Sequence, residues 1–418
     1  MKIAVIGGGL LGISSAYTLQ SRGHEVTLLE TRETLALETS FAPGGMLTAS
    51  MSDPWNSPGV YKYLLKSLFD PYAPMKLHMH TIPSLLFWGF SFLRNSSFNK
   101  HLDATLANYF LAQYSLKKTR ETRELLSLSY DHSITGDMKV FREEKKMIEP
   151  RRIAKKLEEF GLEFFELDKH GAVGVEPSLD PIRDKIAGAL FFPQDECGDA
   201  YKFCCQLSGE MEKIGVTVKT NFAATELKKK SNKITGINTS EGFFPANNVV
   251  VAAGNNSAKL MKNLGVSIPI KPVKGYSATL DVRNIKNVPK LPIVDDAMHA
   301  AVVPLGQRLR LVGTAEFSGF NTEVNSDRID SLFFVLENLF PNISAEVDKS
   351  DVEIWAGLRP MSSDGKPFIG PGKIEGLYLN TGHGHLGWTM AMGSAWLLAD
   401  LIEGKDPEIP SLPFSPTR

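Results

Sequence analysis

The first thirty residues alternate between apolar runs and glycine-rich or polar segments, in the order strand, turn, helix, strand. Residues 2–6, KIAVI, form a β-branched run that predicts a buried parallel strand. The turn GGGLLG follows at 7–12, and apolar positions at helical spacing continue to Gly23, which suits a helix end. Residues 24–30, HEVTLLE, predict a second strand. This order is typical of a βαβ unit that binds a dinucleotide.

Each glycine of this turn has a physical role in such a unit. Gly7 permits the tight turn, Gly9 lets the backbone approach a pyrophosphate, and Gly12 lets the helix pack against the strand. The first N–H groups of the helix attract the phosphates. Glu30 ends the second strand, about 18 residues after Gly12, where an acid accepts hydrogen bonds from the adenosine ribose. These features together predict a dinucleotide site.

Three later segments favour FAD over NAD. Residues 38–46, ETSFAPGGM, place the hydroxyls of Thr39 and Ser40 before a Gly-Gly turn that can follow a pyrophosphate. Residues 247–260, NNVVVAAGNNSAKL, predict a strand and a glycine turn, which read alone are equally a plain strand and turn. Residues 376–404 predict a strand, the turn TGHGHLG and an apolar helix from Trp388 to Ile402 that ends at Gly404. The start of that helix would favour an anionic reduced flavin beside it.

Histidines and cysteines give no sign of a metal site. His383 and His385 are two residues apart on a glycine turn without nearby carboxylates, so we expect them to shape the turn or pack on the ring. Cys197, Cys204 and Cys205 are odd in number and match no metal pattern, which favours reduced thiols. No cysteine falls in a flavin-facing motif, so we expect non-covalent FAD.

Length and composition narrow the class of protein. A chain of 418 residues with 43% hydrophobic content predicts two or three soluble domains. The net charge is −1 and no basic stretch is present, so nucleic acid is not expected as a partner. We find no signal peptide and no run of about 18 apolar residues, which predicts a cytoplasmic protein.

One segment leaves membrane contact open. Residues 83–93, PSLLFWGFSFL, are apolar and aromatic, and they follow YKYLLKSLF at 61–69. They suit core or interdomain packing. They also suit a peripheral membrane contact, where aromatic side chains lie at the interface and Lys62 and Lys66 would meet anionic headgroups.

Residues 355–370, WAGLRPMSSDGKPFIG, contain one arginine in an apolar surrounding. A guanidinium keeps its charge in a protein, so burying Arg359 is costly unless an anion meets it. The partner would be solvent, a carboxylate such as Asp364 or Asp351, or an anionic substrate. The residues themselves leave these three open.

Several of these motifs together resemble a known family. MKIAVIGGGLLGISSAYTL, PVKGYS, GLRPMSSDGKPFIGP and NTGHGHLGWTMAMGSA are similar to the D-amino-acid oxidase and glycine oxidase superfamily of FAD-dependent oxidoreductases. The likeness is closest to the bacterial D-amino-acid dehydrogenases and runs nearly end to end, least so over residues 95–150. It implies an α/β fold: a Rossmann-like FAD domain and a discontinuous α+β substrate domain with a mixed sheet. The implied boundaries are 1–52, 151–268 and 351–418 for the FAD domain, and 53–150 and 269–350 for the substrate domain.

The resemblance also assigns site residues. It makes Arg359 the clamp for the substrate carboxylate, and it places Tyr276 on the strand facing the flavin, although a tyrosine there is equally a core residue. Trp55 and His299 are weaker candidates for the substrate pocket, and His299 is equally a core histidine. The implied cofactor contacts are Ile6, Gly7, Gly9, Leu10, Leu11, Gly12, Glu30, Thr39, Ser40, Gly44, Gly45, Met46, Ala224, Ala253, Gly254, Gly357, Gly382, His383, Gly384, His385, Leu386, Gly387, Trp388 and Thr389.

The implied reaction is oxidative deamination of a D-amino acid resembling D-alanine or D-proline. Hydride passes from Cα to flavin N5, a 2-oxo acid and ammonia form, and a quinone or another non-oxygen acceptor takes the electrons. The alternatives are an oxidase or dehydrogenase of glycine, sarcosine or D-hydroxyproline, and a non-catalytic FAD-binding subunit. The oligomeric state stays open.

Overall fold

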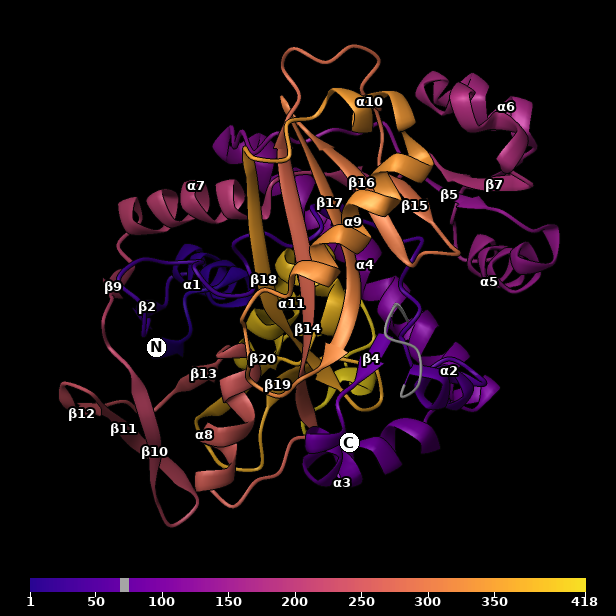
Figure 1. Ribbon diagram of the computed structural model, residues 1–418. Coiled ribbons are helices and arrows are strands. Elements are labelled where there is room, and N and C mark those ends of the chain that lie inside the picture. The colour runs from indigo at the N-terminus through magenta and orange to yellow at the C-terminus, as the bar shows by residue number, and fades with distance from the viewer. Residues whose placement is uncertain (68–74) are drawn as a thin grey trace.

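The computed structural model describes residues 1–67 and 75–418, which form helices packed around two large sheets (Figure 1). Each sheet combines strands from distant parts of the chain, so neither sheet is formed by one continuous segment. The mixed α/β class expected from the sequence is confirmed. Within the described residues no helix has the length and apolar character needed to cross a membrane.

The first sheet has six strands in the order β19-β20-β13-β1-β2-β9. Their bounds are β1 Lys2–Ile6, β2 Glu25–Leu29, β9 Thr217–Lys219, β13 Val249–Val251, β19 Phe368–Pro371 and β20 Leu377–Thr381. All neighbours run parallel except β19, which pairs antiparallel with β20. The strands predicted at 2–6, 24–30 and 247–251 are present, and their parallel pairing explains the continuous apolar runs.

The second sheet has nine strands and is mixed. Eight follow the order β18-β14-β17-β16-β15-β5-β7-β6, and β4 pairs with β17. The bounds are β4 Met75–Leu77, β5 Asp137–Phe141, β6 Phe165–Leu167, β7 Gly188–Phe192, β14 Ile270–Asp281, β15 Ile293–Asp295, β16 Ala300–Leu305, β17 Arg308–Phe317 and β18 Val352–Ser362.

Two smaller sheets and the helices complete the fold. The small sheets are β3 Met46–Leu47 with β8 Glu196–Cys197, and β10 Ala224–Lys230, β11 Lys233–Thr239 and β12 Gly242–Pro245. The α-helices are α1 Leu10–Ser21, α2 Val60–Ser67, α3 Ile82–Arg94, α4 Phe98–Leu126, α5 Ile148–Glu158, α6 Lys169–Val175, α7 Ala200–Lys213, α8 Ser257–Asn263, α9 Ser326–Leu339, α10 Pro341–Glu346 and α11 Gly387–Glu403.

Helix α11 is the centre of the first core. Twelve of its residues are buried, and it packs against α1 and α4. The predicted helix at 388–402 is therefore present, and Gly404 ends it in a left-handed conformation, with φ 67°. Helix α9 covers one face of the nine-stranded sheet, where Leu332 and Leu336 join its apolar cluster.

Strand pairing differs from the expected boundaries at three strands. β6 and β7 lie in the range expected for the FAD domain, yet they pair within the nine-stranded sheet. β18 does so as well and continues through Arg359 to Ser362. The strand continues because every residue from Val352 to Ser362 pairs with β14.

Gly12 makes the closest helix-to-strand approach in the first sheet. A Cβ added at this position would lie 1.7 Å from the carbonyl oxygen of Gly7 and 3.7 Å from the side chain of Ala252. The first helical turn therefore sits directly on the glycine turn, as the sequence predicts. No side chain fits between them.

We predict that Gly12→Ala destabilises the fold by about 1–3 kcal/mol or more, because the added methyl forces helix and turn apart. Thermal unfolding and the amount of FAD retained after purification measure the effect. Gly209→Ala is the matched control, since Gly209 is an exposed position of α7 with no atom within 4 Å of the added Cβ. That variant should be unchanged or more stable by up to about 1 kcal/mol. Equal behaviour of the two variants would contradict the packing described above.

Candidate active site

A single large cavity of about 1150 Å³ connects the glycine turn after β1 with Arg359 on β18. Its walls come from both large sheets and from the turn before α11. All of the site residues expected from the sequence line this cavity except Gly12, whose role is the packing just described. The cavity exceeds the usual size of a site for one small molecule.

The glycine turn and Glu30 form one end of the cavity. The two carboxylate oxygens of Glu30 accept hydrogen bonds from the backbone N–H groups of Gly8 (2.6 Å) and Arg32 (2.8 Å). The Oγ of Ser40 accepts from the N–H of Leu10 at 2.9 Å, which ties the 38–46 segment to the start of α1. These bonds hold the acid and the loop in fixed positions along the cavity wall.

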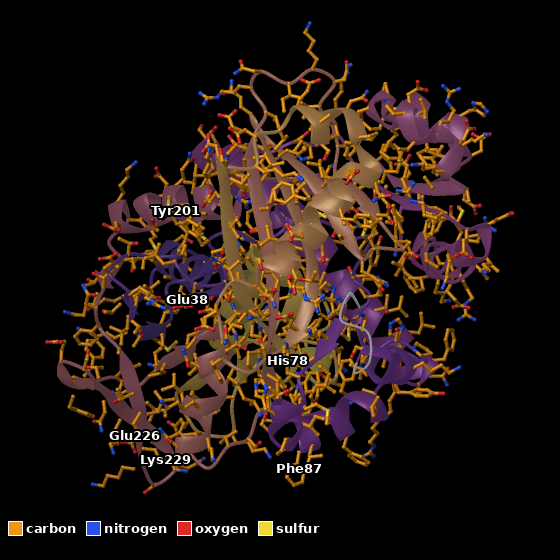
Figure 2. All side chains as sticks on the ribbon, viewed as in Figure 1. Glu38, His78, Phe87, Tyr201, Glu226 and Lys229 are labelled. Atoms are coloured by element: carbon orange, nitrogen blue, oxygen red, sulfur yellow. The ribbon has the colours of Figure 1, made fainter. Side chains whose placement is uncertain are left out.

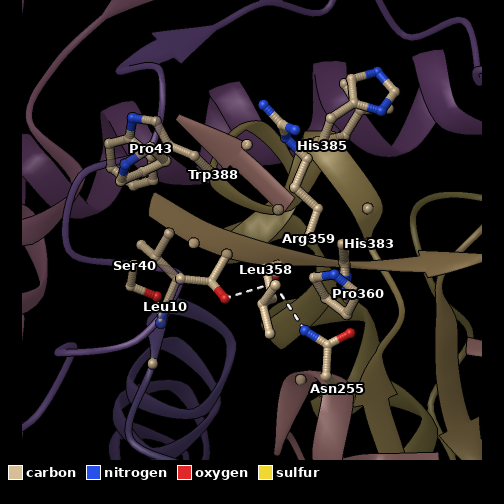
Figure 3. A pocket seen from close by; sticks show the side chains of 18 of the residues that line it. Leu10, Ser40, Pro43, Asn255, Leu358, Arg359, Pro360, His383, His385 and Trp388 are labelled. Atoms are coloured by element: carbon tan, nitrogen blue, oxygen red, sulfur yellow. Dashed lines mark hydrogen bonds between the residues drawn. The ribbon is translucent and has the colours of Figure 1, made fainter. Parts of the chain in front are cut away.

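Strand β18, which carries Arg359, is hydrogen-bonded to the segments that line the glycine-turn end of the cavity. The carbonyl of Leu358 accepts hydrogen bonds from Thr39 Oγ1 and from Asn255 Nδ2, both at 2.8 Å. Figure 3 shows Leu358 and Arg359 pointing to opposite sides of β18. The residue whose carbonyl holds the strand, Leu358, is thus directly followed by the residue whose guanidinium points to the other side, Arg359.

The turn before α11 contains two buried or partly buried histidines. His383 Nε2 lies 2.8 Å from Ser394 Oγ, and its Nδ1 has no hydrogen-bond partner within the described residues. Burial lowers the pKa of His383 to about 3 and that of His385 to about 4, so both are neutral at neutral pH. Trp388 donates its indole N–H to the carbonyl of Gly198 at 3.2 Å. The part of the chain that is described contains no cluster of potential metal ligands.

Arg359 forms no ion pair with any described carboxylate. Its Nη1 donates to the carbonyl of Thr314 at 3.0 Å, and its guanidinium lies 5.2 Å from the centre of the Trp55 ring. Burial lowers the pKa of Arg359 to about 10, so the charge remains at neutral pH. Asp364 instead binds Arg418 at 2.7 Å, which removes it as the partner considered from the sequence.

Gly275 makes room for the guanidinium. A Cβ at Gly275 would lie 2.2 Å from Nη2 of Arg359, so the planar group rests directly on the backbone of β14. Sequence reasoning missed this glycine, although it lies in the quoted motif KGYS. Asn255 and Thr314 were also missed, because their contacts use distant backbone carbonyls that no local pattern predicts.

Tyr276 has a different environment from the expected one. Its ring packs in the apolar cluster beneath α9, and its hydroxyl donates to Glu316 at 2.9 Å. Glu316 also accepts from Arg328 Nε at 2.7 Å and lies 3.6 Å from Lys274 Nζ. The hydroxyl is thus held within a buried ionic cluster rather than beside Arg359. The cause is strand alternation, which puts Gly275 and Tyr276 on opposite faces of β14.

A β-bulge in β17 separates this ionic cluster from Arg359. Tyr276 pairs with Gly313 and Lys274 pairs with Glu316, so two residues of β17 oppose Gly275. The bulged residue Thr314 has a positive φ of 60°, uncommon for a side chain of its type. Its carbonyl is the one that accepts from Arg359.

The two weaker pocket candidates also line the cavity. Trp55 stacks on His385, with ring centres 5.0 Å apart and planes at 21°. His299 is exposed and has a positive φ of 48° in the turn before β16. The core alternative for His299 is therefore wrong, since its side chain faces the open cavity. None of the three cysteines, all free thiols, lines the cavity in the described part of the chain.

The site fits FAD on its own geometry. The elongated cavity, the close backbone approach at the glycine turn, the fixed carboxylate of Glu30 and the unpartnered Nδ1 of His383 suit a dinucleotide with a ring system at its far end. The family model "FAD dependent oxidoreductase" matches residues 2–401. The chain belongs to this family, and FAD is its cofactor.

Relatives and solved structures agree with this assignment. A D-amino acid dehydrogenase of Sinorhizobium medicae is 37% identical over 98% of this chain and 97% of its own length, and one of Rhizobium johnstonii is 36% identical over all of both. Glycine oxidase of Geobacillus kaustophilus has a TM-score of 0.77 at 23% identity, covering 100% of this chain and 98% of that one. L-proline dehydrogenase of P. horikoshii has a TM-score of 0.78 at 18% identity, with 100% and 97% covered. These two structures show the common fold.

We predict that Gly275→Ala weakens the binding of a simple carboxylate such as propionate by about tenfold or more, while FAD is retained. The added methyl displaces the guanidinium from its seat, and one well-placed charge-assisted hydrogen bond has about this value. The measurement is the rise in Tm that propionate gives to the holoenzyme. Gly174→Ala, with no atom within 4 Å of the added Cβ, is the control and should respond like the wild type. An undiminished response of Gly275→Ala would show that Arg359 is not held there.

Proposed function

We propose that the protein is an FAD-dependent D-amino-acid dehydrogenase. It oxidises small D-amino acids such as D-alanine or D-proline to the imino acid, which takes up water and releases a 2-oxo acid and ammonia. The observation that carries the proposal is the charged Arg359 in the cavity wall, without a carboxylate partner among the described residues. The names of the full-length relatives support the same substrate class.

Arg359 is suited to bind the substrate carboxylate. A guanidinium holds a carboxylate with two parallel hydrogen bonds and so fixes the orientation of the whole substrate. Its Nη1 is already bound to Thr314, and its plane rests on Gly275, so little side-chain freedom is lost on binding. The substrate anion would then supply the missing countercharge.

FAD supplies the acceptor for the α-hydrogen, which leaves with its electron pair as a hydride. The chain's own residues orient the substrate and exclude water from the cavity. His385 is neutral, so it adds no second positive charge beside the substrate nitrogen. Tyr276 lines the cavity, but its hydroxyl is bound to Glu316, so this proposal gives it no contact with the substrate. Binding of FAD is non-covalent, in line with the absence of all three cysteines from the cavity lining among the described residues.

We also propose two interwoven domains. The FAD domain takes residues 1–52, 198–268 and 363–418. The substrate domain takes residues 53–197 and 269–362. These boundaries follow the strand pairing, which joins β5, β6, β7 and β18 in the nine-stranded sheet. They modify the expected division at 151–197 and at 351–362.

We propose further that helix α3 touches an anionic membrane surface, where a quinone would take the electrons. Trp88 and Phe92 pack inward, as the core alternative requires, but the opposite face of α3 exposes Leu86, Phe87 and Phe90. Phe87 is 94% exposed at the edge of the molecule (Figure 2). Residues 54–102 contain five basic residues, Lys62, Lys66, Lys76, Arg94 and Lys100, and the single acid Asp70. The side chain of Lys66 and all of Asp70 lie outside the described residues.

We predict that Arg359→Ala keeps FAD but reduces the rate of flavin reduction by D-amino acids at least about a hundredfold, in line with truncation of one partner of a buried charge pair. The measurement is anaerobic bleaching of the flavin by a panel of D- and L-amino acids, glycine, sarcosine and D-hydroxyproline. Arg283→Ala removes an exposed arginine paired with Asp281 and is the control. Reduction by L-amino acids alone would contradict the proposed substrate, and full activity of Arg359→Ala would contradict the clamp. Hydrogen peroxide formation, compared with reduction of a soluble quinone, identifies the acceptor.

We predict that Phe87→Asp lowers cosedimentation with phosphatidylglycerol vesicles by about tenfold or more, because a buried phenylalanine contributes about 1.5–3 kcal/mol. Activity with a soluble dye should not change. Phe243→Asp is the matched control, since Phe243 is 57% exposed on β12, in a separate sheet. Binding that is equal for the wild type and Phe87→Asp would rule out α3 as the contact.

A further inference from the structure

The guanidinium of Arg359 and the imidazole of His385 meet on one aromatic ring. Trp55 lies 5.2 Å from Arg359 Cζ and 5.0 Å from the centre of the His385 ring, to which it is nearly parallel. The three residues come from the loop after β3, the strand β18 and the turn before α11. They join the proposed substrate clamp to the turn that lines the cofactor end of the cavity.

The loop that carries Trp55 is held firmly on both sides. Asn108 of α4 donates to the carbonyls of Ser52 (3.1 Å) and Gly365 (2.9 Å), and so ties the loop to the turn after β18. His101 Nε2 lies 3.1 Å from the carbonyl of Pro54. A Cβ at Gly365 would be 2.3 Å from the side chain of Pro54, which shows how closely the two segments approach. The indole therefore has little freedom to move away from Arg359.

The remaining contacts of Arg359 leave its orientation incompletely fixed. Its Nη1 donates to the carbonyls of Thr314 at 3.0 Å and Lys274 at 3.5 Å, so both hydrogen bonds start from one nitrogen, and Gly275 adds only a flat surface. A third element is needed to keep the guanidinium plane from turning about that nitrogen. The face of an indole provides it, because its negative quadrupole attracts a cation without supplying a counterion. A carboxylate in this position would hold Arg359 equally well but would occupy the clamp.

The second ring contact of Trp55, with His385, is compatible with this arrangement. His385 is neutral at neutral pH, because burial lowers its pKa more than the nearby carboxylate of Asp53 raises it, and the charge of Arg359 lowers it further. A neutral imidazole stacks on the indole without competing with the guanidinium for the ring. Trp55 thus contacts one cation and one neutral ring.

We propose that Trp55 is a positioning residue that holds Arg359 in the orientation that receives a carboxylate, and that it does so through the face of its ring. The inference rests on the proposed function only in its use of Arg359 as an anion site. It predicts that anion binding follows the strength of the cation–π contact, in the order Trp55, Trp55→Tyr, Trp55→Phe, Trp55→Leu.

The test compares two ligands of nearly equal size, propionate and propionamide, by titration of the flavin absorbance of the holoenzyme. We expect the affinity for propionate to fall through the series by roughly 2-fold to 30-fold, the range of a cation–π contact. The affinity for propionamide should change little, since it presents no anion to Arg359. Flavin content and Tm identify any variant that is not folded, and Trp55→Phe keeps an aromatic core in case Trp55→Leu does not fold.

Trp396→Leu is the matched control, because the Trp396 ring also lies over cations, Arg22 at 4.5 Å and Lys118 at 4.4 Å, but does not line the cavity. It should lower Tm and leave the ratio of propionate to propionamide affinity at the wild-type value. The inference is overturned if the Trp55 series keeps that ratio, if both ligands weaken equally, or if the wild type binds both alike. A wild type that prefers propionate but oxidises no D-amino acid would contradict the proposed reaction, and the series would still decide the role of Trp55.

Discussion

The structure depends on a half-buried positive charge, Arg359 in the cavity wall, that the described part of the chain leaves without a counterion. Desolvating a guanidinium costs several kcal/mol, and proteins usually recover the cost with a carboxylate. Here Arg359 receives a carbonyl, a glycine surface and an indole face. Each of these accepts or stabilises the N–H groups without neutralising the charge. The site is therefore stable enough to fold and is most strongly stabilised when an anion arrives.

The bulge at Thr314 keeps the carboxylate of Glu316 from pairing with Arg359. In an unbroken register Glu316 would oppose Val273, which pairs on its other side with Arg359, and both side chains would face the cavity. Glu316 would then be free to neutralise the guanidinium. With the extra residue, Glu316 lies opposite Lys274 on the α9 face and binds Arg328 and Tyr276 instead. The strained residue at 314 is thus the cost of keeping the protein's own carboxylate away from the clamp.

Sequence reasoning was most accurate where a residue's role is set by its immediate neighbours. The strand–turn–helix order around Gly12, the acid at Glu30 and the end of α11 at Gly404 all follow from local rules, and all are present. Tyr276 lies on the expected strand and lines the cavity, but the hydrogen bond from its hydroxyl to Glu316 was not predicted, because that contact depends on the pairing of β14 with another strand. The extent of β18 and the bulge in β17 depend in the same way on register between distant segments.

Under the proposed function the cavity accommodates two anions at once, the substrate carboxylate and a flavin that gains negative charge on reduction. Two like charges in a space of low dielectric repel strongly unless each has its own positive partner. The proposed partners come from two elements of the cavity wall: Arg359 on β18, and the N-terminus of α11, whose first residues Gly387 to Thr389 also line the cavity. His383 and His385 in the turn before α11 are neutral, because burial lowers their pKa values. They therefore add no positive charge to those of Arg359 and the helix N-terminus. The position of charge in the site is thus set by one side chain and one helix, both fixed by the backbone.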